Sequence, residues 1–372
     1  KLRCEFQPQR GKIIIYQSSP RGERFYFMSF HSSTYTVESV TSGHPDKVCD
    51  QISDAILDAY LSEDPLSRVA VETFGCHGLL VVGGEVTSRG EVNAEEIARR
   101  VYREIGYDEE LKVIANIVRQ SPDIAQGVDT GGAGDQGIMY GYATRETPEY
   151  LPRAVVLAQA LARGLERLRR ENVLPWLRPD GKTQVTMRDG ELETVLVSTQ
   201  HAPETSQERL RNDLVEHLIR PAIGEGTSVQ ILTNPTGKFE VGGFAADTGL
   251  TGRKLMVDTY GGLAPHGGGA FSGKDATKVD RSAAYMARFA AKNLVARGLA
   301  DECLVSVAYA IGRAEPVMVQ AVDGQGKTLP MSALSDFDFR PAAIIERLGL
   351  RRPIFRQTAA YGHFGRAGLP WE

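Results

Sequence analysis

Apolar residues along the chain recur with two spacings, one typical of helices and one of strands. Every fourth residue from 52 to 60 is apolar, which predicts an amphipathic helix. The stretches 68–74 and 79–87 are rich in β-branched residues and flank a Cys-His-Gly turn, so they predict a hairpin. A capped helix around 97–105 and a strand at 111–118 follow.

The same order of elements returns twice. The hairpins of successive blocks begin about 115 to 120 residues apart, a spacing that indicates an internal repeat. We therefore predict three similar α+β domains in a helix–hairpin–helix–strand order. The later segments are a helix at 157–168, strands at 183–187 and 192–198 around Asp189-Gly190, a helix at 210–219, a strand at 228–233, a helix at 281–297, strands at 303–310 and 317–322, and a helix at 342–348.

The repeat suggests a division of the chain into an extension and three domains. Residues 1–27 form a basic, irregular N-terminal extension without periodicity, and Met28 is our predicted natural start. A cleaved organelle transit peptide is the alternative. We predict a first α+β repeat at 28–130, a second at 131–250 with interleaved termini, and a third at 251–372.

Composition and charge narrow the classes of protein that the chain can represent. Of 372 residues, 42% are apolar and 24% charged, and the formal net charge is −4 with dispersed Lys and Arg. This argues against nucleic acid as the main partner, because such proteins usually carry a basic face. No apolar run approaches the ~18 residues that a membrane span needs. The four cysteines form no C-x-x-C pair, so we expect unpaired thiols and a cytoplasmic location.

A glycine-rich segment ends in Lys274 and nearly matches a phosphate-binding P-loop. The residue after the lysine is Asp275 where a P-loop has Ser or Thr, and no strand leads directly into the loop. A P-loop is therefore not expected. Closely spaced backbone amides with Lys274 and Lys278 still favour an anion cradle, and a plain structural turn is the alternative.

Gly132, Gly134 and Gly137 have the spacing of a dinucleotide-binding fingerprint. The context does not fit, because 138–142 reads as a strand rather than a helix. The glycines instead suggest that 120–135 is a mobile lid, with an ordinary solvent loop as the alternative.

The segment Gly43-His44-Pro45-Asp46-Lys47 places three chemically active side chains at the start of the first predicted helix. Pro45 suits the first helical turn, where its missing N–H is not needed. A carboxylate at this position is often only a partner of the helix dipole. The sequence has no Ser-His-Asp order and no zinc-ligand spacing that would indicate another chemistry.

These segments, taken together, resemble the S-adenosylmethionine synthetase (methionine adenosyltransferase) family from Met28 to Glu372. The resemblance implies three domains about a pseudo-threefold axis, with sheets packed at a dimer interface. The lid is shorter than in many bacterial members. The matching motifs are Glu38-Ser39-Val40-Thr41-Ser42-Gly43-His44-Pro45-Asp46-Lys47, Gln120-Ser121-Pro122-Asp123-Ile124, Gly132-Ala133-Gly134-Asp135-Gln136-Gly137, Leu177-Arg178-Pro179-Asp180-Gly181-Lys182, Asn234-Pro235-Thr236-Gly237-Lys238-Phe239, Gly249-Leu250-Thr251-Gly252-Arg253-Lys254 and Gly267-Gly268-Gly269-Ala270-Phe271-Ser272-Gly273-Lys274-Asp275.

The resemblance implies a reaction in which the sulfur of L-methionine attacks the 5′ carbon of ATP and the released triphosphate is split to phosphate and diphosphate. A thioether carries no proton, so the attack needs no general base. Alignment of the reactants and stabilisation of the leaving triphosphate carry the catalysis. The implied catalytic residues are His44, Lys182, Arg253 and Lys274.

The resemblance also assigns substrates and ions to individual residues. Two Mg²⁺ ions per site would be held by Asp46 and Asp280, and K⁺ by Glu72. Methionine would be framed by Glu85, Gln120, Asp135, Asp247 and Lys278. ATP would contact His44, Asp180, Lys182, Lys238, Phe239, Asp247, Arg253, Lys254, Ala270 and Lys274.

Two other functions remain open from the residues alone, and self-association is expected with any of them. An ATPase or kinase could use the same magnesium and lysine cradle without depending on methionine, and a nucleotide-binding module would hydrolyse nothing. We expect a homodimer or a dimer of dimers, because apolar sheet positions could remain uncovered in a single chain. The positions that suggest this are Val69, Val71, Val185, Val305 and Val307.

Overall fold

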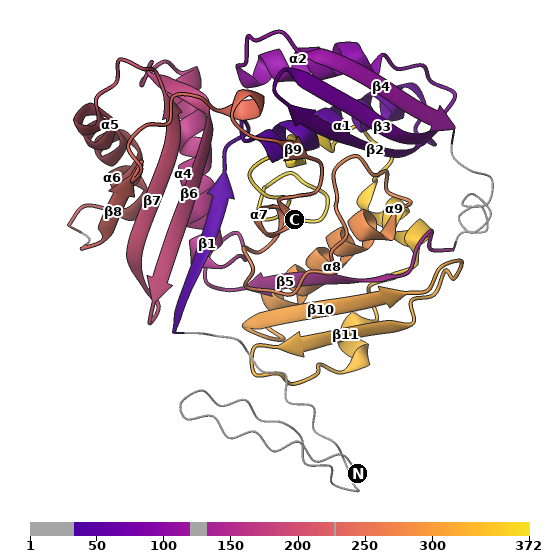
Figure 1. Cartoon of the computed structure of the whole chain (residues 1–372). Coiled ribbons are helices and arrows are strands. Elements are labelled where there is room, and N and C mark those ends of the chain that lie inside the picture. Colours follow the sequence, from indigo (N-terminus) through magenta and orange to yellow (C-terminus); the bar gives the residue numbers. More distant parts are fainter. Residues whose placement is uncertain (1–32, 120–131, 227) are drawn as a thin grey trace, which may run out of the picture.

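The protein folds into three α+β lobes arranged around a common centre, in which the C-terminus lies (Figure 1). The structure is a computed structural model and describes residues 33–119, 132–226 and 228–372. Each lobe is a sheet with helices against one face, as the three-domain α+β prediction required.

The first lobe follows the predicted helix–hairpin–helix–strand order. His44 caps the first helix, where its ring accepts the Asp46 N–H, and Pro45 occupies the first turn. The hairpin turns at His77 and Gly78, which both have positive φ. Its elements are α1 (Pro45–Glu63), β2 (Arg68–Cys76), β3 (Leu79–Thr87), α2 (Ala94–Ile105) and β4 (Lys112–Arg119).

The second lobe repeats this order, and the third repeats it only in part. No strand follows the last helix within the described residues, so the prediction of a complete repeat in the third block was wrong. The second lobe contains α4 (Arg153–Arg170), β6 (Leu177–Arg188), β7 (Glu191–His201), α5 (Gln207–Leu214), the π-helical turn η1 (Val215–Ile219), α6 (Arg220–Ile223) and β8 (Gln230–Thr233). The third contains α8 (Val279–Ala296), β10 (Glu302–Tyr309), β11 (Met318–Asp323) and α9 (Pro341–Leu348).

The three lobes exchange strands in a cycle. Strand β1 (Thr34–Val40) precedes the first lobe but pairs with β6 of the second. Strand β5 (Gly137–Thr144) precedes the second lobe but pairs with β10 of the third, and β9 (Gly249–Leu250) precedes the third but pairs with β2 of the first. The resulting orders are β4-β3-β2-β9, β1-β6-β7-β8 and β11-β10-β5. The predicted domain boundaries remain a prediction, since each sheet draws on two stretches of sequence.

The valines that suggested uncovered sheet faces are buried inside the chain. Their side chains are at most 1% exposed and belong to the hydrophobic core. That argument for an interface was therefore wrong, because strand alternation turns these positions toward the chain's own helices. The residues concerned are Val69, Val71, Val185, Val305 and Val307.

Helix α1 carries a carboxylate at every fourth position, and each accepts backbone N–H groups from a different part of the C-terminal third of the chain. Because residues four apart share a helix face, the four form one stripe. The bonds run from Leu250 N to Asp46 (3.0 Å), from Gly252 N to Asp50 (2.8 Å), from Gly273 N to Asp54 (2.8 Å), and from Phe355 N and Arg356 N to Asp58 (3.0 and 2.9 Å).

Two buried cations form ion pairs with two of these four carboxylates. Lys47 Nζ contacts Asp50 at 2.7 Å and Asp258 at 2.5 Å, and all three side chains are at most 2% exposed. Although burial disfavours its charge, the two carboxylates raise the pKa of Lys47. Arg281 forms a two-pronged bond to Asp54 at 2.6 and 2.7 Å. These ion pairs fasten α1 to the third lobe.

We expect Asp54→Asn to lower the free energy of unfolding by about 3–5 kcal/mol, because it leaves the Arg281 charge buried without a counter-charge. Urea denaturation followed by circular dichroism measures this. The control is Asp301→Asn, whose 90% exposed side chain pairs with Arg145 and whose loss should cost less than about 1 kcal/mol. Equal costs for the two variants would contradict the structural role of Asp54.

Candidate active site

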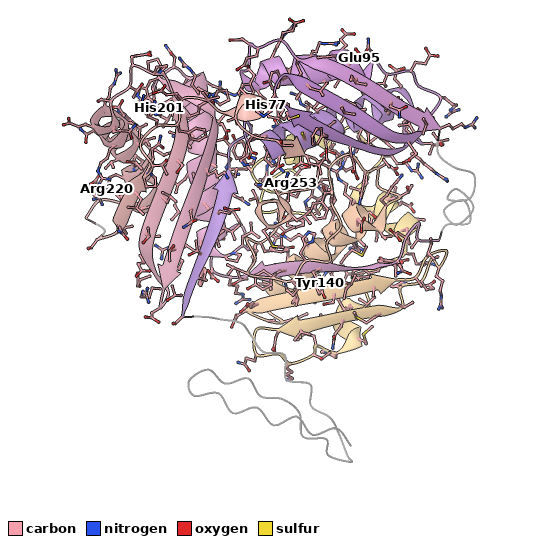
Figure 2. The ribbon with its side chains drawn as sticks, in the orientation of Figure 1. His77, Glu95, Tyr140, His201, Arg220 and Arg253 are labelled. Carbon is pink, nitrogen blue, oxygen red and sulfur yellow. The ribbon has the colours of Figure 1, made fainter. Side chains whose placement is uncertain are left out.

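Loops from all three lobes meet at the centre of the molecule, where Arg253 lies (Figure 2). Lys254 Nζ is 2.5 Å from Asp46 Oδ2, and Arg253 Nε is 3.8 Å from Asp46 Oδ1. Glycine is required where these loops touch, because a Cβ on Gly43 would lie 2.4 Å from the Pro179 carbonyl oxygen. The predicted residues gathered at this centre are His44, Asp46, Asp180, Lys182, Asp247, Arg253 and Lys254.

His44 is a buried, neutral hydrogen-bonding group. Burial, followed by the charges of Lys254 and Lys182, lowers its pKa to about 3. Its Nδ1 accepts the backbone N–H of Asp46 at 3.2 Å. A neutral imidazole that accepts at Nδ1 carries its proton on Nε2, so His44 can donate one hydrogen bond from Nε2.

Asp180 lies at the start of β6 with one oxygen bonded and one without a protein partner. Its Oδ2 accepts the Gly243 N–H at 2.9 Å, and no described residue bonds its buried Oδ1. Burial raises the pKa of Asp180 to about 6. A buried acceptor without a donor is costly, so this oxygen is suited to a donor on a bound molecule.

The glycine-rich segment before α8 lies along the edge of β2. Val71 N donates to Gly273 O at 3.0 Å, and Gly273 has φ +80°. Helix α8 begins only at Val279, so the segment is not a P-loop, as the sequence predicted. Two ion pairs follow it, Lys274 with Asp280 at 2.6 Å and Lys278 with Asp275 at 2.5 Å.

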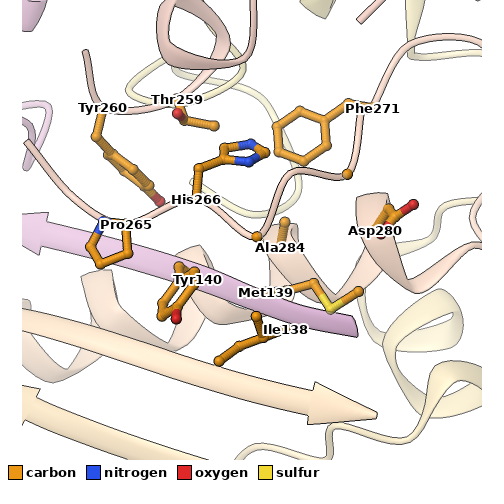
Figure 3. A pocket seen from close by; sticks show the side chains of 12 residues that line it. Ile138, Met139, Tyr140, Thr259, Tyr260, Pro265, His266, Phe271, Asp280 and Ala284 are labelled. Atoms are coloured by element: carbon orange, nitrogen blue, oxygen red, sulfur yellow. The ribbon is translucent and has the colours of Figure 1, made fainter. Parts of the chain in front are cut away.

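A small pocket lies beside this segment and ends at Asp280 (Figure 3). Met139, His266 and Phe271 line it. Ala270 packs against Gly252, where a Cβ would come within 2.5 Å of the Ala270 side chain. The Lys274–Asp280 pair therefore belongs to the same region as the Lys254–Asp46 pair.

Other predicted site residues lie farther out. Lys238 pairs with Glu240 at 3.4 Å, and the backbone of Phe239 bonds to His201, so both sit near the end of β7. Gln200 joins this segment to Asp180 by accepting the Asp180 N–H and donating to the Glu240 carbonyl.

Three acidic residues predicted to bind methionine or potassium are exposed and make no side-chain contact with the central cluster among the described residues. Glu72 and Glu85 lie on the face of the β2–β3 hairpin that points away from α1, since Val69 and Val71 alternate with them toward the helix. Among the described residues, Asp135 accepts the N–H of Gln136 and no other hydrogen bond. Gln120 and most of the predicted lid lie outside the described residues.

The residues that hold the centre together were not predicted from the sequence. Asp50, Asp54 and Asp258 were not singled out, nor was Arg281 next to Asp280. The four-residue spacing of carboxylates on the first predicted helix was the available signal, because it puts them on one face.

The described residues contain no group of three or more His, Cys, Asp or Glu side chains arranged for a metal ion. Asp46 and Asp280 each pair with a lysine, and within the described part of the chain neither belongs to a larger group of carboxylates arranged for a metal ion. Single carboxylates suit Mg²⁺ when phosphate oxygens and waters complete its shell. Among the described helices, none combines the length and apolar character needed to cross a bilayer.

Comparison with known proteins gives matches to one family over nearly the whole chain. Residues 32–122, 130–239 and 241–372 match the N-terminal, central and C-terminal domains of S-adenosylmethionine synthetase. The chain is 53% identical over 376 residues to an S-adenosylmethionine synthase of Desulforudis audaxviator, covering 91% of this chain and 95% of that protein. It is also 53% identical over 378 residues to one from Pseudothermotoga lettingae, covering 91% and 96%.

The neutral state of His44 predicts how stability depends on pH. Its folded pKa of about 3 lies below the ordinary value of 6.5, so the unfolded chain takes up a proton first as the pH falls. The imidazole should therefore reduce stability below about pH 6.5, by at most ~1.4 kcal/mol per pH unit. Urea unfolding of wild type and His44→Gln between about pH 4 and 7 isolates this contribution, because Gln does not titrate. Parallel stability curves would show that His44 is not held neutral.

Proposed function

The chain belongs to the S-adenosylmethionine synthetase family and is a methionine adenosyltransferase, and we propose how its residues make S-adenosylmethionine. The sulfur of L-methionine attacks C5′ of ATP in line, and the triphosphate leaves intact before it is hydrolysed to phosphate and diphosphate. The observation that carries this proposal is the neutral His44 beside the carboxylate–lysine pair of Asp46 with Lys254, with a second such pair, Asp280 with Lys274, in the glycine-rich segment before α8.

His44 donates from Nε2 to the departing 5′ oxygen of ATP. A neutral donor suits this step. The leaving triphosphate takes the bonding electron pair, so its 5′ oxygen needs a hydrogen-bond donor. The sulfur has no proton to lose, so His44 need not act as a base. Lys182, Arg253, Lys254 and Lys274 stabilise the charge that builds on the triphosphate, which is the largest electrostatic demand of the reaction.

The charge balance of the centre supports a requirement for divalent cations. Apart from the buried ion pairs of Lys47 and Arg281, five cationic side chains and five carboxylates belong to the segments of this region, so the protein alone supplies little net positive charge for a triphosphate. Bound Mg²⁺ would neutralise phosphate charge, with one ion held by Asp46 and one by Asp280. The side chains counted are Lys182, Arg253, Lys254, Lys274 and Lys278 against Asp46, Asp180, Asp247, Asp275 and Asp280.

The remaining assignments follow the same family match. Asp180 accepts a donor from ATP at its unpartnered Oδ1, and Lys238, Phe239 and Ala270 contact the nucleotide. Glu72 holds K⁺. Methionine lies among Glu85, Gln120, Asp135, Asp247 and Lys278, where the carboxylates favour the developing sulfonium.

We also propose that the active unit is a homodimer, or a dimer of dimers, with shared sites. The outward face of the first sheet supports this, since it carries an apolar row of Phe74, Val81 and Ile114 across three strands. Phe74 is 40% and Ile114 44% exposed. Glu85 lies on this same face beside the 51% exposed Val118, so a partner packed there would meet it. The cytoplasmic location stays a prediction.

Incubation with ATP, L-methionine, Mg²⁺ and K⁺ should yield S-adenosylmethionine and equal amounts of phosphate and diphosphate, measured by mass spectrometry and ³¹P NMR. Omitting methionine should suppress ATP turnover, because no other nucleophile is aligned with C5′. Full-rate ATP cleavage without methionine and without a sulfonium product would instead indicate an ATPase.

Asp46→Asn and Asp280→Asn should each lower turnover by about 10²–10³, because each removes one preorganised electrostatic contact. The apparent Mg²⁺ requirement should rise in both variants, as measured by steady-state rates over a magnesium titration. A matched control is Asp213→Asn, which changes a carboxylate bonded to Trp176 away from the centre. A wild-type magnesium response would remove Asp46 and Asp280 from the metal sites.

Mixing two inactive variants tests the shared site. Glu85→Ala and Lys182→Ala, allowed to exchange subunits, should recover about one quarter of wild-type activity, because half of the dimers are mixed and each has one intact site. His44→Ala with Lys182→Ala is the control that should recover nothing, since these residues belong to one cluster of one chain. Full activity in a species that sediments as a monomer would exclude sharing.

A further inference from the structure

The peptide bond that precedes His44 is held at both of its polar atoms. Its N–H belongs to His44 and donates to the Thr41 carbonyl at 3.1 Å. Its carbonyl belongs to Gly43 and accepts the Tyr107 hydroxyl at 2.6 Å. The first partner lies within the same turn, whereas Tyr107 is 64 positions away along the chain. Tyr107 therefore ties this peptide bond to the segment that follows helix α2.

The orientation of this peptide bond sets the direction of the His44 side chain. Each residue has only two soft backbone torsions, because peptide groups are planar. His44 has φ −60° and ψ 135°. Its ψ is restricted by Pro45, since a residue before proline avoids the helical region. Its φ depends on the plane of the preceding peptide group, which the bond from Tyr107 helps to fix.

Tyr107 is itself held firmly in place beside the nucleotide-facing part of the centre. The residue is 3% exposed, and its ring stacks on Tyr102 with 4.9 Å between centroids. Tyr102 stacks in turn on Phe244 at 5.5 Å. A Cβ on Gly243 would lie 2.5 Å from the Tyr107 ring, and the Gly243 N–H bonds Asp180. The phenol thus fits between the loop of His44 and the loop that holds Asp180.

The Tyr107 hydroxyl stays a hydrogen-bond donor. Burial, followed by the negative charge of Asp180, raises the pKa of Tyr107 well above its ordinary value. The Gly43 carbonyl accepts this donor inside the protein, where an unpaired carbonyl would be costly. The bond therefore persists over the pH range in which the folded protein works.

We propose that Tyr107 is a positioning residue for adenosyl transfer and acts through His44. Its hydroxyl holds the Gly43–His44 peptide bond so that the Nε2–H of His44 is aimed at the departing 5′ oxygen of ATP. The inference rests on the proposed function, in which His44 donates to that oxygen. Misplacing such a group by ~1 Å can lower a rate by about 10²-fold. Hydrolysis of the triphosphate, in contrast, begins after the C5′–O bond has broken and does not need this donor.

The test compares Tyr107→Phe with Tyr309→Phe in the full chain. Tyr309 is a matched control, because it is also 3% exposed and its hydroxyl donates to the Phe339 carbonyl at 2.6 Å in the third lobe. Both variants leave one carbonyl without its donor, so their melting temperatures should fall by similar amounts. The kcat of S-adenosylmethionine formation should fall about 10- to 100-fold in Tyr107→Phe alone, with the KM values for ATP and methionine little changed.

Hydrolysis of added triphosphate, measured on the same samples, separates positioning from a general disturbance of the site. Its rate should stay within about twofold of wild type in Tyr107→Phe, because this step does not use His44 in the proposed scheme. The ratio of the two activities does not depend on how much of a variant is folded. Equal losses in both activities would overturn the proposal.

Combination with His44→Ala tests whether the effect passes through the imidazole. Tyr107→Phe should cause no further loss of adenosyl transfer in the His44→Ala background, because residues that act as a unit are not additive. Losses that multiply would overturn the proposal, as would wild-type turnover of Tyr107→Phe beside a slow His44→Ala. Wild-type turnover of His44→Ala would instead reject the proposed role of His44, and this inference with it.

Discussion

The rest of this structure depends on one kind of interaction. The carboxylates along one face of helix α1 accept hydrogen bonds from the backbone N–H groups of distant loops. Asp46, Asp50, Asp54 and Asp58 each bond loop amides from the C-terminal third of the chain. Loops seldom have internal partners for their amides, so each bond fixes a loop that would otherwise need water. One helix of the first lobe thus sets the positions of the loops that carry Arg253 and Lys274.

The free-energy cost of burying these carboxylates is tolerable only because two cations are buried with them. Lys47 and Arg281 are both inaccessible to solvent, and each bonds a stripe carboxylate directly. Buried ion pairs add little net stability compared with apolar packing, but breaking one is expensive. The arrangement therefore favours a single docking geometry of α1 against the third lobe, which is what a preorganised electrostatic site requires.

The cyclic exchange of strands explains why the catalytic groups converge. Strands β1, β5 and β9 each leave one lobe and complete the sheet of another, so the segments next to them pass through the centre. His44 follows β1, and Arg253 and Lys254 follow β9. Close contacts there need glycine, as at Gly249, where a Cβ would lie 2.2 Å from the Pro45 carbonyl oxygen.

The sequence by itself determined the local elements and the residue types of the site. Apolar spacing predicted the helices and hairpins, since the periods of 3.6 and 2 are properties of the local backbone. The motif around His44 and the glycine-rich segment drew attention to His44, Asp46 and Lys274, whose roles stay predictions. The resemblance to one family was confirmed over nearly the whole chain.

Only the tertiary structure decided which faces and strands meet. In the folded chain Val69 and Val185 are buried, although the sequence had suggested them for an interface. Strand β9 has only two residues, so no apolar period in the sequence could have predicted it. The tertiary structure also paired Asp54 with Arg281 across 227 positions. Contacts between distant segments depend on how whole lobes pack, and no local spacing of residues carries that information.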